Sequence, residues 1–180
     1  RDFMHQWLEI YVKNQLSPTT VQHYIDQTEK YIIPQFGDTC LQQLKNIDIQ
    51  KWVFSLQKAS PRTGKPLSPK TIKNILLNLS AAMKKAVMLE LIPKNPCDDL
   101  TLPKLEHYQP KVYSMEEVET LLQCARNTAL YLPLMIEICL GLRRGKLLAL
   151  RWHHVDFQTG CLTVEENLVT VNNQTITKAP

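Results

Sequence analysis

The 180-residue sequence contains no run of about 18 uncharged apolar residues, which excludes a typical membrane-spanning helix. The longest apolar stretch, Ala129 to Leu142, is short and is interrupted by Pro133 and Glu137. The five cysteines are odd in number and form no Cys-x-x-Cys pair, so a disulfide framework and a zinc site are both disfavoured. These absences favour a globular protein with reduced thiols.

Acidic residues are scarce in one long segment. From Leu41 to Lys94 there are ten basic residues and only two acids, Asp48 and Glu90, which gives a net charge of +8. From Lys111 onward seven basic residues balance seven acids. A basic first half beside a neutral second half indicates contact with a polyanion, although a solvated lysine-rich face is an equally common explanation.

Apolar spacing in the first half predicts four amphipathic helices. Ser17 and Ser68, each followed by proline, are placed to cap the second and the fourth helix. We expect the second helix to stop before Pro34 and Gly37. The expected helices cover residues 2–14, 18–33, 46–56 and 69–91.

A proline-rich stretch, residues 93–112, has little periodicity and predicts an extended linker. Beyond it, Ser114 to Glu117 forms a capping box that opens a helix. The apolar run 129–140 predicts a buried helix, and residues 161–164 and 168–171 alternate like strands. Asn172-Asn173 is a possible turn before a return strand at 174–178. The chain begins with Arg1 rather than methionine and ends inside this strand pair, so we expect a fragment.

Two adjacent arginines follow the apolar run, in Gly141-Leu142-Arg143-Arg144-Gly145, and a second apolar helix begins at once. Arginine is almost never buried without an anionic partner. Both side chains can extend to the surface along their alkyl stems. Alternatively, one is held inward to bind a phosphate or a carboxylate in bidentate geometry. Residue chemistry alone slightly favours the surface position.

The stretch Gly-Leu-Arg-Arg-Gly-x-Leu-Leu-Ala-Leu-Arg-Trp, followed by His153-His154-Val155-Asp156-Phe157, resembles the first conserved box of the tyrosine recombinase (phage integrase) family. The resemblance implies a mainly α fold: a helical SAM-like core-binding bundle followed by a truncated α+β catalytic domain with a short antiparallel sheet. The domains implied are a core-binding, DNA-binding domain at 1–92, the linker at 93–112, and the N-terminal part of the catalytic domain at 113–180. One departure is Lys146, where the family usually has an acid.

The resemblance also implies site-specific DNA recombination or integration through a 3′-phosphotyrosyl intermediate, with no metal and no cofactor. Arg143 matches the family's first catalytic arginine, and Lys178 is a candidate for the lysine of the hairpin that follows. No His-x-x-Arg occurs, and none of the six tyrosines lies in a context like the nucleophile's. We therefore expect this chain to be inactive alone. The implied partners are double-stranded DNA and, for the whole protein, further copies in a tetrameric synapse. The implied location is the cytoplasm of a bacterium carrying the phage or mobile element.

The expected DNA contacts lie on the polar sides and at the starts of the second and fourth helices, and in the basic turn between residues 59 and 66. Gln27 lies on the same side of the second helix as Thr20, His23 and Lys30. The residues expected to contact DNA are Thr19, Thr20, His23, Lys30, Arg62, Lys65, Lys70, Lys73, Asn74, Lys84 and Lys85.

Three functional hypotheses follow. The first is a fragment of an integrase, which Arg143 in its box supports. The second is a non-catalytic DNA-binding protein with a degenerate recombinase fold, which Lys146 supports. The third, a helical protein-interaction module, explains the apolar periodicity but explains neither the basic segment nor the arginine stretch.

Overall fold

The computed structural model describes residues 1–104, 109–171 and 174–179, and the chain forms two compact units, residues 1–107 and 108–180. The expected turn at Asn172-Asn173 and part of the expected linker lie outside the described residues. The expected fold class is confirmed, because the chain is mostly helical and carries two small antiparallel sheets. None of the described helices combines the length and the apolar composition needed to cross a bilayer.

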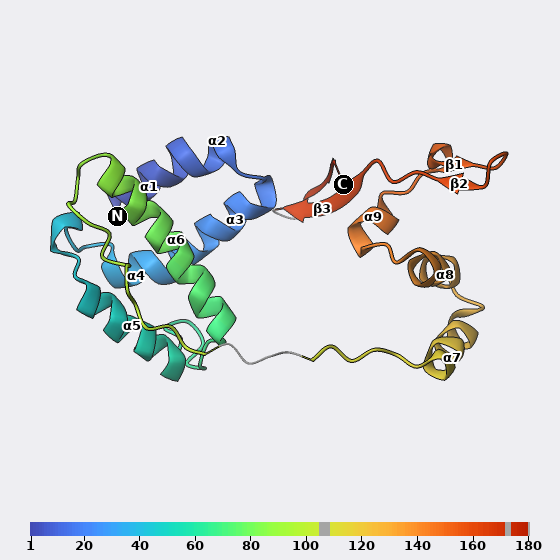
Figure 1. The fold of residues 1–180 in the computed structure, drawn as a ribbon, viewed down its shortest axis with the longest axis horizontal. Helices are drawn as coiled ribbons and strands as arrows, with labels where there is room; N and C mark the ends of the chain where they lie inside the picture. Colours follow the sequence, from blue (N-terminus) through green and yellow to red (C-terminus); the bar gives the residue numbers. More distant parts are fainter. Residues whose placement is uncertain (105–108, 172–173, 180) are drawn as a thin grey trace. The chain divides into compact units, whose positions relative to one another are not determined.

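The first unit is a bundle of four long helical segments, two of which contain a widened π-helical turn (Figure 1). Its elements are α1 (Asp2–Trp7), η1 (Leu8–Val12), α2 (Lys13–Gln15), α3 (Pro18–Gln27), η2 (Thr28–Ile32), α4 (Ile33–Phe36), η3 (Leu41–Gln43), α5 (Asn46–Lys58) and α6 (Pro69–Met88).

Helix α6 is the central element of this bundle, since it contacts α1, α3, η2 and α5. Its apolar positions recur at helical spacing, and Ile72, Ile75 and Leu79 are fully or almost fully buried. Ser68 accepts a hydrogen bond from Thr71 N–H at 3.2 Å, which confirms the expected cap. At the equivalent start of α3, Ser17 makes no such bond to the backbone.

The second helical segment does not stop before Pro34. It continues through α4 and ends at Phe36, before Gly37, so only the second of the two expected stop signals acts. The wide turn of η2 closes with Ile33 N–H donating to Thr28 O. Pro34 then lies in the first turn of α4, where a backbone N–H is not required, and the helix therefore tolerates it.

The proline-rich stretch begins by packing against the bundle. Ile92 is buried, and Cys97 and Leu100 pack against the same core. Asn46 of α5 donates to Asp98 O at 2.7 Å, and Thr101 N–H donates to Gln50 Oε1 at 2.7 Å. The bundle therefore holds the chain to about residue 101, while the proposed division at 92 and 112 stays a prediction.

The second unit contains three short helices and two separate hairpins. Its elements are α7 (Met115–Ala125), α8 (Tyr131–Leu140), α9 (Arg144–Leu148), η4 (Trp152–His154), β1 (Val155–Asp156), β2 (Cys161–Leu162), β3 (Asn167–Val171) and β4 (Gln174–Lys178). The capping box at Ser114 and Glu117 is confirmed, with both reciprocal bonds present. Strands β3 and β4 pair antiparallel, which confirms the expected return strand.

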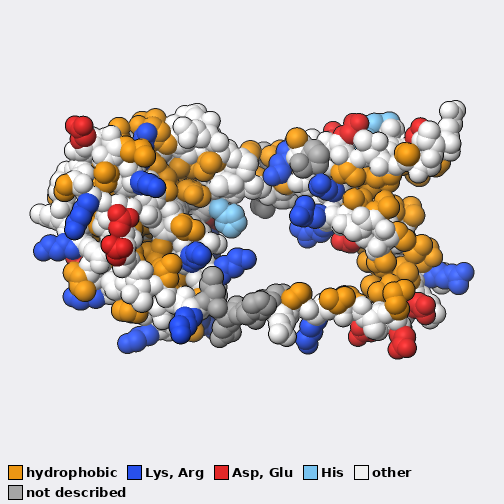
Figure 2. Space-filling view, in the orientation of Figure 1, with side chains coloured by type: hydrophobic (Ala, Val, Ile, Leu, Met, Phe, Trp, Pro, Cys, Tyr) orange, Lys and Arg blue, Asp and Glu red, His pale blue; other side chains and the backbone are white. Residues whose placement is uncertain are grey.

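Helix α8 is not buried, contrary to the expectation from its apolar sequence. None of its residues is buried, and Leu132 and Leu140 are 60% and 52% exposed. The reason is that α7 and α9, its helical neighbours, each cover only part of its circumference. Figure 2 shows hydrophobic side chains gathered over this region of the second unit.

Candidate nucleic-acid interface and arginine site

Three lysines form an exposed stripe along one side of α6. Lys70, Lys73 and Lys84 are all exposed, and the spacings of three and fourteen residues place them on one side of a helix. The opposite side of α6 faces the core of the bundle, because it carries the buried apolar residues. Arg62 and Lys65 are exposed in the turn that precedes this helix. We call Lys70, Lys73 and Lys84 the α6 stripe.

The starts of α3 and α6 both carry hydroxyl groups. Ser17 Oγ lies 3.2 Å from Thr19 Oγ1 and 2.9 Å from Thr20 Oγ1, and Ser68 Oγ lies 2.8 Å from Thr71 Oγ1. Thr19 and Thr20 are half-buried. These hydroxyl groups satisfy one another in the free protein, and hydroxyl groups are common donors to phosphate oxygens.

Two of the expected DNA-contacting lysines are already engaged within the protein. Lys30 Nζ lies 2.9 Å from Asp26 Oδ2, and this contact holds the pKa of Asp26 below its usual value. Lys85 Nζ lies 4.1 Å from the centre of the Tyr11 ring, a cation–π contact between α6 and η1. His23 and Asn74, by contrast, are exposed and available.

Asn78 of α6 is not among the residues expected at the interface. It is buried against α3, and only 1% of it is exposed. The signal for it was present in the sequence, because Asn78 is a polar residue at core spacing between Ile75 and Ala82. Its partners include Gln27, which places that side chain at the border of the interface.

In the second unit, Arg143 is the residue immediately before α9, and both Arg143 and Arg144 are exposed. Gly141 ends α8 in the left-handed conformation, with φ of 61°, which reverses the chain direction and separates the two helices. The surface position is thus the one that this structure shows, and the Arg143 guanidinium faces solvent.

Helix α9 packs tightly on strand β3. A Cβ atom at Gly145 would lie 2.7 Å from Leu168 O and would collide with the side chain of Asn167, so only glycine allows this approach. Asn167 is directly opposite Lys178 in the antiparallel register. Helix α9, which begins directly after Arg143, and strand β4, which carries Lys178, therefore both contact β3, and the Arg143 and Lys178 side chains are exposed.

Further charged residues follow Arg143 in the sequence. Arg151 Nε lies 3.5 Å from Glu166 Oε2, an atom that is buried and makes no hydrogen bond within the described part of the chain. Lys146 is half-buried in α9 and forms no ion pair with any described residue. The family that this stretch resembles usually has an acidic residue at the position of Lys146. Here that position supplies no carboxylate.

Of the two adjacent histidines His153 and His154, only His154 has a structural role at η4. His154 is buried, its Nδ1 accepts a hydrogen bond from Arg151 N–H at 3.1 Å, and its carbonyl accepts from Thr163 N–H. His153 is exposed. Among the described residues no group of three metal-ligating side chains comes together.

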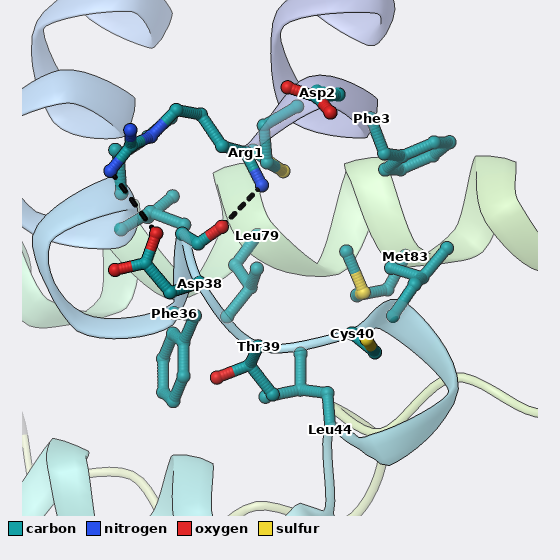
Figure 3. A pocket seen from close by; sticks show the side chains of 15 residues that line it. Arg1, Asp2, Phe3, Phe36, Asp38, Thr39, Cys40, Leu44, Leu79 and Met83 are labelled. Atoms are coloured by element: carbon teal, nitrogen blue, oxygen red, sulfur yellow. Dashed lines mark hydrogen bonds and ion pairs between the residues drawn. The ribbon is translucent and has the colours of Figure 1, made fainter.

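An apolar cavity of about 290 Å³ lies beside the start of α1 in the first unit (Figure 3). Phe3, Leu79 and Met83 are among the residues that line it. Its charged lining residues are Arg1, Asp2 and Asp38, and Arg1 pairs with Asp38 at 3.4 Å. Because the remaining lining is largely apolar, nothing in this cavity indicates chemistry.

The first unit matches a known family. Residues 1–57 match the family described as phage integrase, N-terminal SAM-like domain. Across 153 residues, or 83% of this chain, the sequence is 31% identical to a tyrosine recombinase XerC from Salmonella typhi, covering 50% of that protein. The chain spans about half the length, or less, of the curated relatives that it matches first.

Two solved structures share the fold over 99% of this chain. One is the Tn1549 transposon integrase in complex with circular intermediate DNA, with a TM-score of 0.76 and 20% identity, of which 58% is covered. The other is a lambda integrase tetramer bound to a Holliday junction, with a TM-score of 0.72 and 16% identity, of which 49% is covered. At these identities the likeness concerns the fold alone.

Proposed function

Because the chain belongs to the tyrosine recombinase (phage integrase) family, we propose that it binds double-stranded DNA at a recombination site and acts in site-specific recombination. In the whole protein, a tyrosine oxygen attacks a phosphodiester, the bond to the 5′-oxygen breaks, and a 5′-hydroxyl leaves. The 3′-phosphotyrosyl bond conserves the energy of the broken bond, so neither ATP nor metal is required. Rejoining is the reverse step on the exchanged strand.

The observation that carries this proposal is the α6 stripe. Lys70, Lys73 and Lys84 are exposed and follow a basic turn, and the segment from Leu41 to Lys94 contains only two acids. No ion pair neutralises these three lysines within the described residues. Free ammonium groups at helical spacing suit the regularly spaced charges of a DNA backbone, and each contact releases counterions.

Arg143 is proposed as the group that stabilises charge on the non-bridging phosphate oxygens as the bond breaks. Its guanidinium is exposed and has no anionic partner among the described residues, so it is free to contact a phosphate. An arginine placed on a phosphoryl transition state contributes roughly 10³–10⁵ in rate. Lys178 lies on β4, which pairs with the strand β3 that packs against α9, and it is the proposed hairpin lysine of the same site.

The test is the binding of this chain to short fluorescent duplexes, measured by anisotropy across a salt series. We expect the slope of log affinity against log salt to become shallower by about 1.8 in the Lys70→Ala/Lys73→Ala double variant. The Lys104→Ala/Lys111→Ala double variant removes the same charge from exposed positions outside the basic segment and keeps the slope of the original chain. An undiminished slope in the first variant, or no binding at low salt, would contradict the proposal.

Arg143→Ala separates binding from chemistry. Because one exposed arginine is a small part of a polyanion interface, this variant should bind duplex DNA almost as tightly as the original chain. We expect the variant instead to lower DNA cleavage by the whole protein, measured as the yield of covalent protein–DNA product. A whole protein whose Arg143→Ala variant cleaves at the original rate would rule out the proposed catalytic role.

A second candidate function is a non-catalytic DNA-binding protein that kept the recombinase fold, and it is favoured by Lys146 in place of the usual acid. Reading the gene beyond the codon for Pro180 distinguishes the two. A downstream His-x-x-Arg and a tyrosine support the enzyme, whereas a stop codon near Pro180 supports the binding protein.

For the whole protein we propose assembly of four copies on recombining DNA in the cytoplasm of the cell that carries the element. A lambda integrase tetramer bound to a Holliday junction shares this fold, which supports the proposed assembly. Light scattering of the whole protein with and without its DNA site tests it.

A further inference from the structure

Asn78 of α6 holds α3 through its side-chain amide. Its Nδ2 lies 3.0 Å from Tyr24 O, 3.3 Å from Gln27 Oε1 and 3.4 Å from Thr28 Oγ1. Asn78 and Thr28 are fully or almost fully buried, whereas Gln27 is half-exposed. The amide therefore joins the core to a side chain at the protein surface.

The backbone carbonyl of Tyr24 determines how both amides are oriented. A carbonyl oxygen only accepts, so the Asn78 atom facing it must be the NH₂ group. That nitrogen only donates, so the Gln27 atom facing it must be the oxygen. The NH₂ group of Gln27 consequently points away from Asn78.

The oxygen of Asn78 is left buried, and unpaired within the described residues, by this assignment. Asn78 Oδ1 has no hydrogen-bond partner among the described residues, which is a destabilising arrangement. Rotating the Asn78 amide by 180° would place this oxygen against Tyr24 O, a backbone carbonyl that can only accept. The unpaired oxygen is therefore the consequence of the hydrogen bond that the NH₂ group donates to Tyr24 O.

Gln27 lies at the edge of the proposed DNA-binding face. It follows His23 by four residues and Thr20 by seven, so the three side chains lie on one side of α3. On α6, exposed Asn74 precedes Asn78 by one turn. The Gln27 NH₂ group therefore emerges where the outer sides of α3 and α6 meet.

We infer that Gln27 is a specificity-determining residue that donates to a base edge in the major groove, and that Asn78 is the positioning residue that fixes Gln27 as a donor. This inference rests on the proposed DNA binding and adds to it a chemical preference. A free glutamine contacts adenine with both its oxygen and its NH₂ group. Gln27 turns its oxygen toward Asn78, so the group that it presents to DNA is the donor.

A donor has a definite preference among bases. Guanine N7 and O6, adenine N7 and thymine O4 accept hydrogen bonds in the major groove, whereas cytosine presents only a donor there. The base contacted by Gln27 is therefore guanine, adenine or thymine and not cytosine. Phosphate oxygens also accept, but a phosphate contact carries no sequence preference.

The experiment determines the base preference of the 180-residue chain with a duplex library that has a randomised central stretch, sequenced before and after binding. Preferred duplexes and their single-base variants are then measured by anisotropy across a salt series. The variants are Gln27→Glu, Gln27→Ala and Asn78→Leu. Gln6→Glu is the control, because it adds the same charge at an exposed position on α1, outside the proposed interface.

Gln27→Glu replaces a donor by an acceptor, and carboxylates accept from cytosine N4. We expect one position of the site to change from excluding cytosine to preferring it, while Gln6→Glu leaves the preference unchanged. Gln27→Ala should lose at least about fivefold discrimination at that same position. Asn78→Leu frees the Gln27 amide to rotate, so discrimination against cytosine should fall while the salt slope stays constant.

Asn78→Leu is expected to fold, because Tyr24 O still accepts a hydrogen bond from Thr28 N–H. Circular dichroism melting checks this, and the two Gln27 variants test the donor role even if Asn78→Leu does not fold.

An unaltered base preference in both Gln27 variants overturns the inference while leaving DNA binding intact. A uniform loss of affinity with a shallower salt slope overturns it in favour of a phosphate contact. Absence of any DNA binding by the original chain overturns the proposed function together with this inference.

Discussion

Gly145 and Leu168 approach so closely that a Cβ atom on the glycine would lie 2.7 Å from the leucine carbonyl oxygen. Real Cβ atoms do not reach this distance, so Gly145→Ala must push α9 away from β3. Overpacking of this kind costs about 1–3 kcal/mol. We expect faster hydrogen exchange across the β3–β4 hairpin, measured by mass spectrometry, whereas the neighbouring exposed substitution Arg144→Ala leaves exchange unchanged. Equal protection in both variants would show that the contact is not tight in solution.

Two adjacent lysines of α6 should behave differently. Lys84 belongs to the α6 stripe, whereas Lys85 lies over the Tyr11 ring. We expect Lys84→Met to make the salt slope of DNA binding shallower by about 0.9 with little change in stability. Lys85→Met should lower the free energy of unfolding by about 0.5–1 kcal/mol, measured by urea denaturation, with a smaller effect on the slope. The reverse pattern would place Lys85, not Lys84, on the DNA.

Asp26 makes stability depend on pH in the acid range. Lys30 is the main cause of its lowered pKa, and Gln22 adds a second hydrogen bond. Since the pKa is lower in the folded chain, this carboxylate stabilises the fold above its unfolded pKa and loses that contribution as pH falls through the folded value. Asp26→Asn should therefore weaken the acid dependence of the urea midpoint. Because both side chains are well exposed, the effect is small.

The same substitution carries a second expectation for binding. Asp26→Asn frees Lys30 from its partner, so the salt slope of DNA binding should become steeper if Lys30 then contacts phosphate. Anisotropy at neutral pH, with Asp48→Asn as the matched control because Asp48 is exposed and forms no ion pair with a described residue, measures this. A slope that increases equally in both variants would indicate only the change in net charge.

Cysteine reactivity separates one thiol from the rest. Burial raises the pKa of Cys97 to about 12, while Cys40, Cys124, Cys139 and Cys161 are exposed. At pH 8 only on the order of one Cys97 thiol in ten thousand is the reactive thiolate. Brief maleimide treatment should therefore label the exposed cysteines and leave Cys97 unlabelled. Mass spectrometry of the peptides measures the labelling of each cysteine. Rapid labelling of Cys97 would mean that the stretch after Ile92 detaches from the bundle.

Local signals in the sequence predicted the helix starts well. Pro18 and Pro69 open helices because the fixed proline φ favours a first turn, and at α6 the hydrogen bond that Ser68 accepts from the backbone adds to it. The capping box at Ser114 was equally clear, since its bonds are made within four residues. The passage of the second helix through Pro34 was missed, because a widened turn has no spacing that apolar periodicity reveals.

Features that depend on distant partners were less predictable. The run that forms α8 is apolar enough for a core, but composition does not say which elements cover a helix, and the expectation of burial was wrong. Asn78 looked like one polar residue in an apolar stripe, and its partner at Tyr24 is 54 residues away in the sequence. The close approach of Gly145 to β3 depends in the same way on a strand that comes later in the chain.

The widened turn at Thr28–Ile32 also sets the helical phase of everything that follows it. A π turn contains one residue more than an α turn, so the residues after it are rotated by about 100° relative to a regular helix. That offset lets the consecutive residues Ile32 and Ile33 both face the core, at 1% and 9% exposure. Deleting one residue from the turn would restore the regular phase and carry Ile33 and Phe36 away from the core.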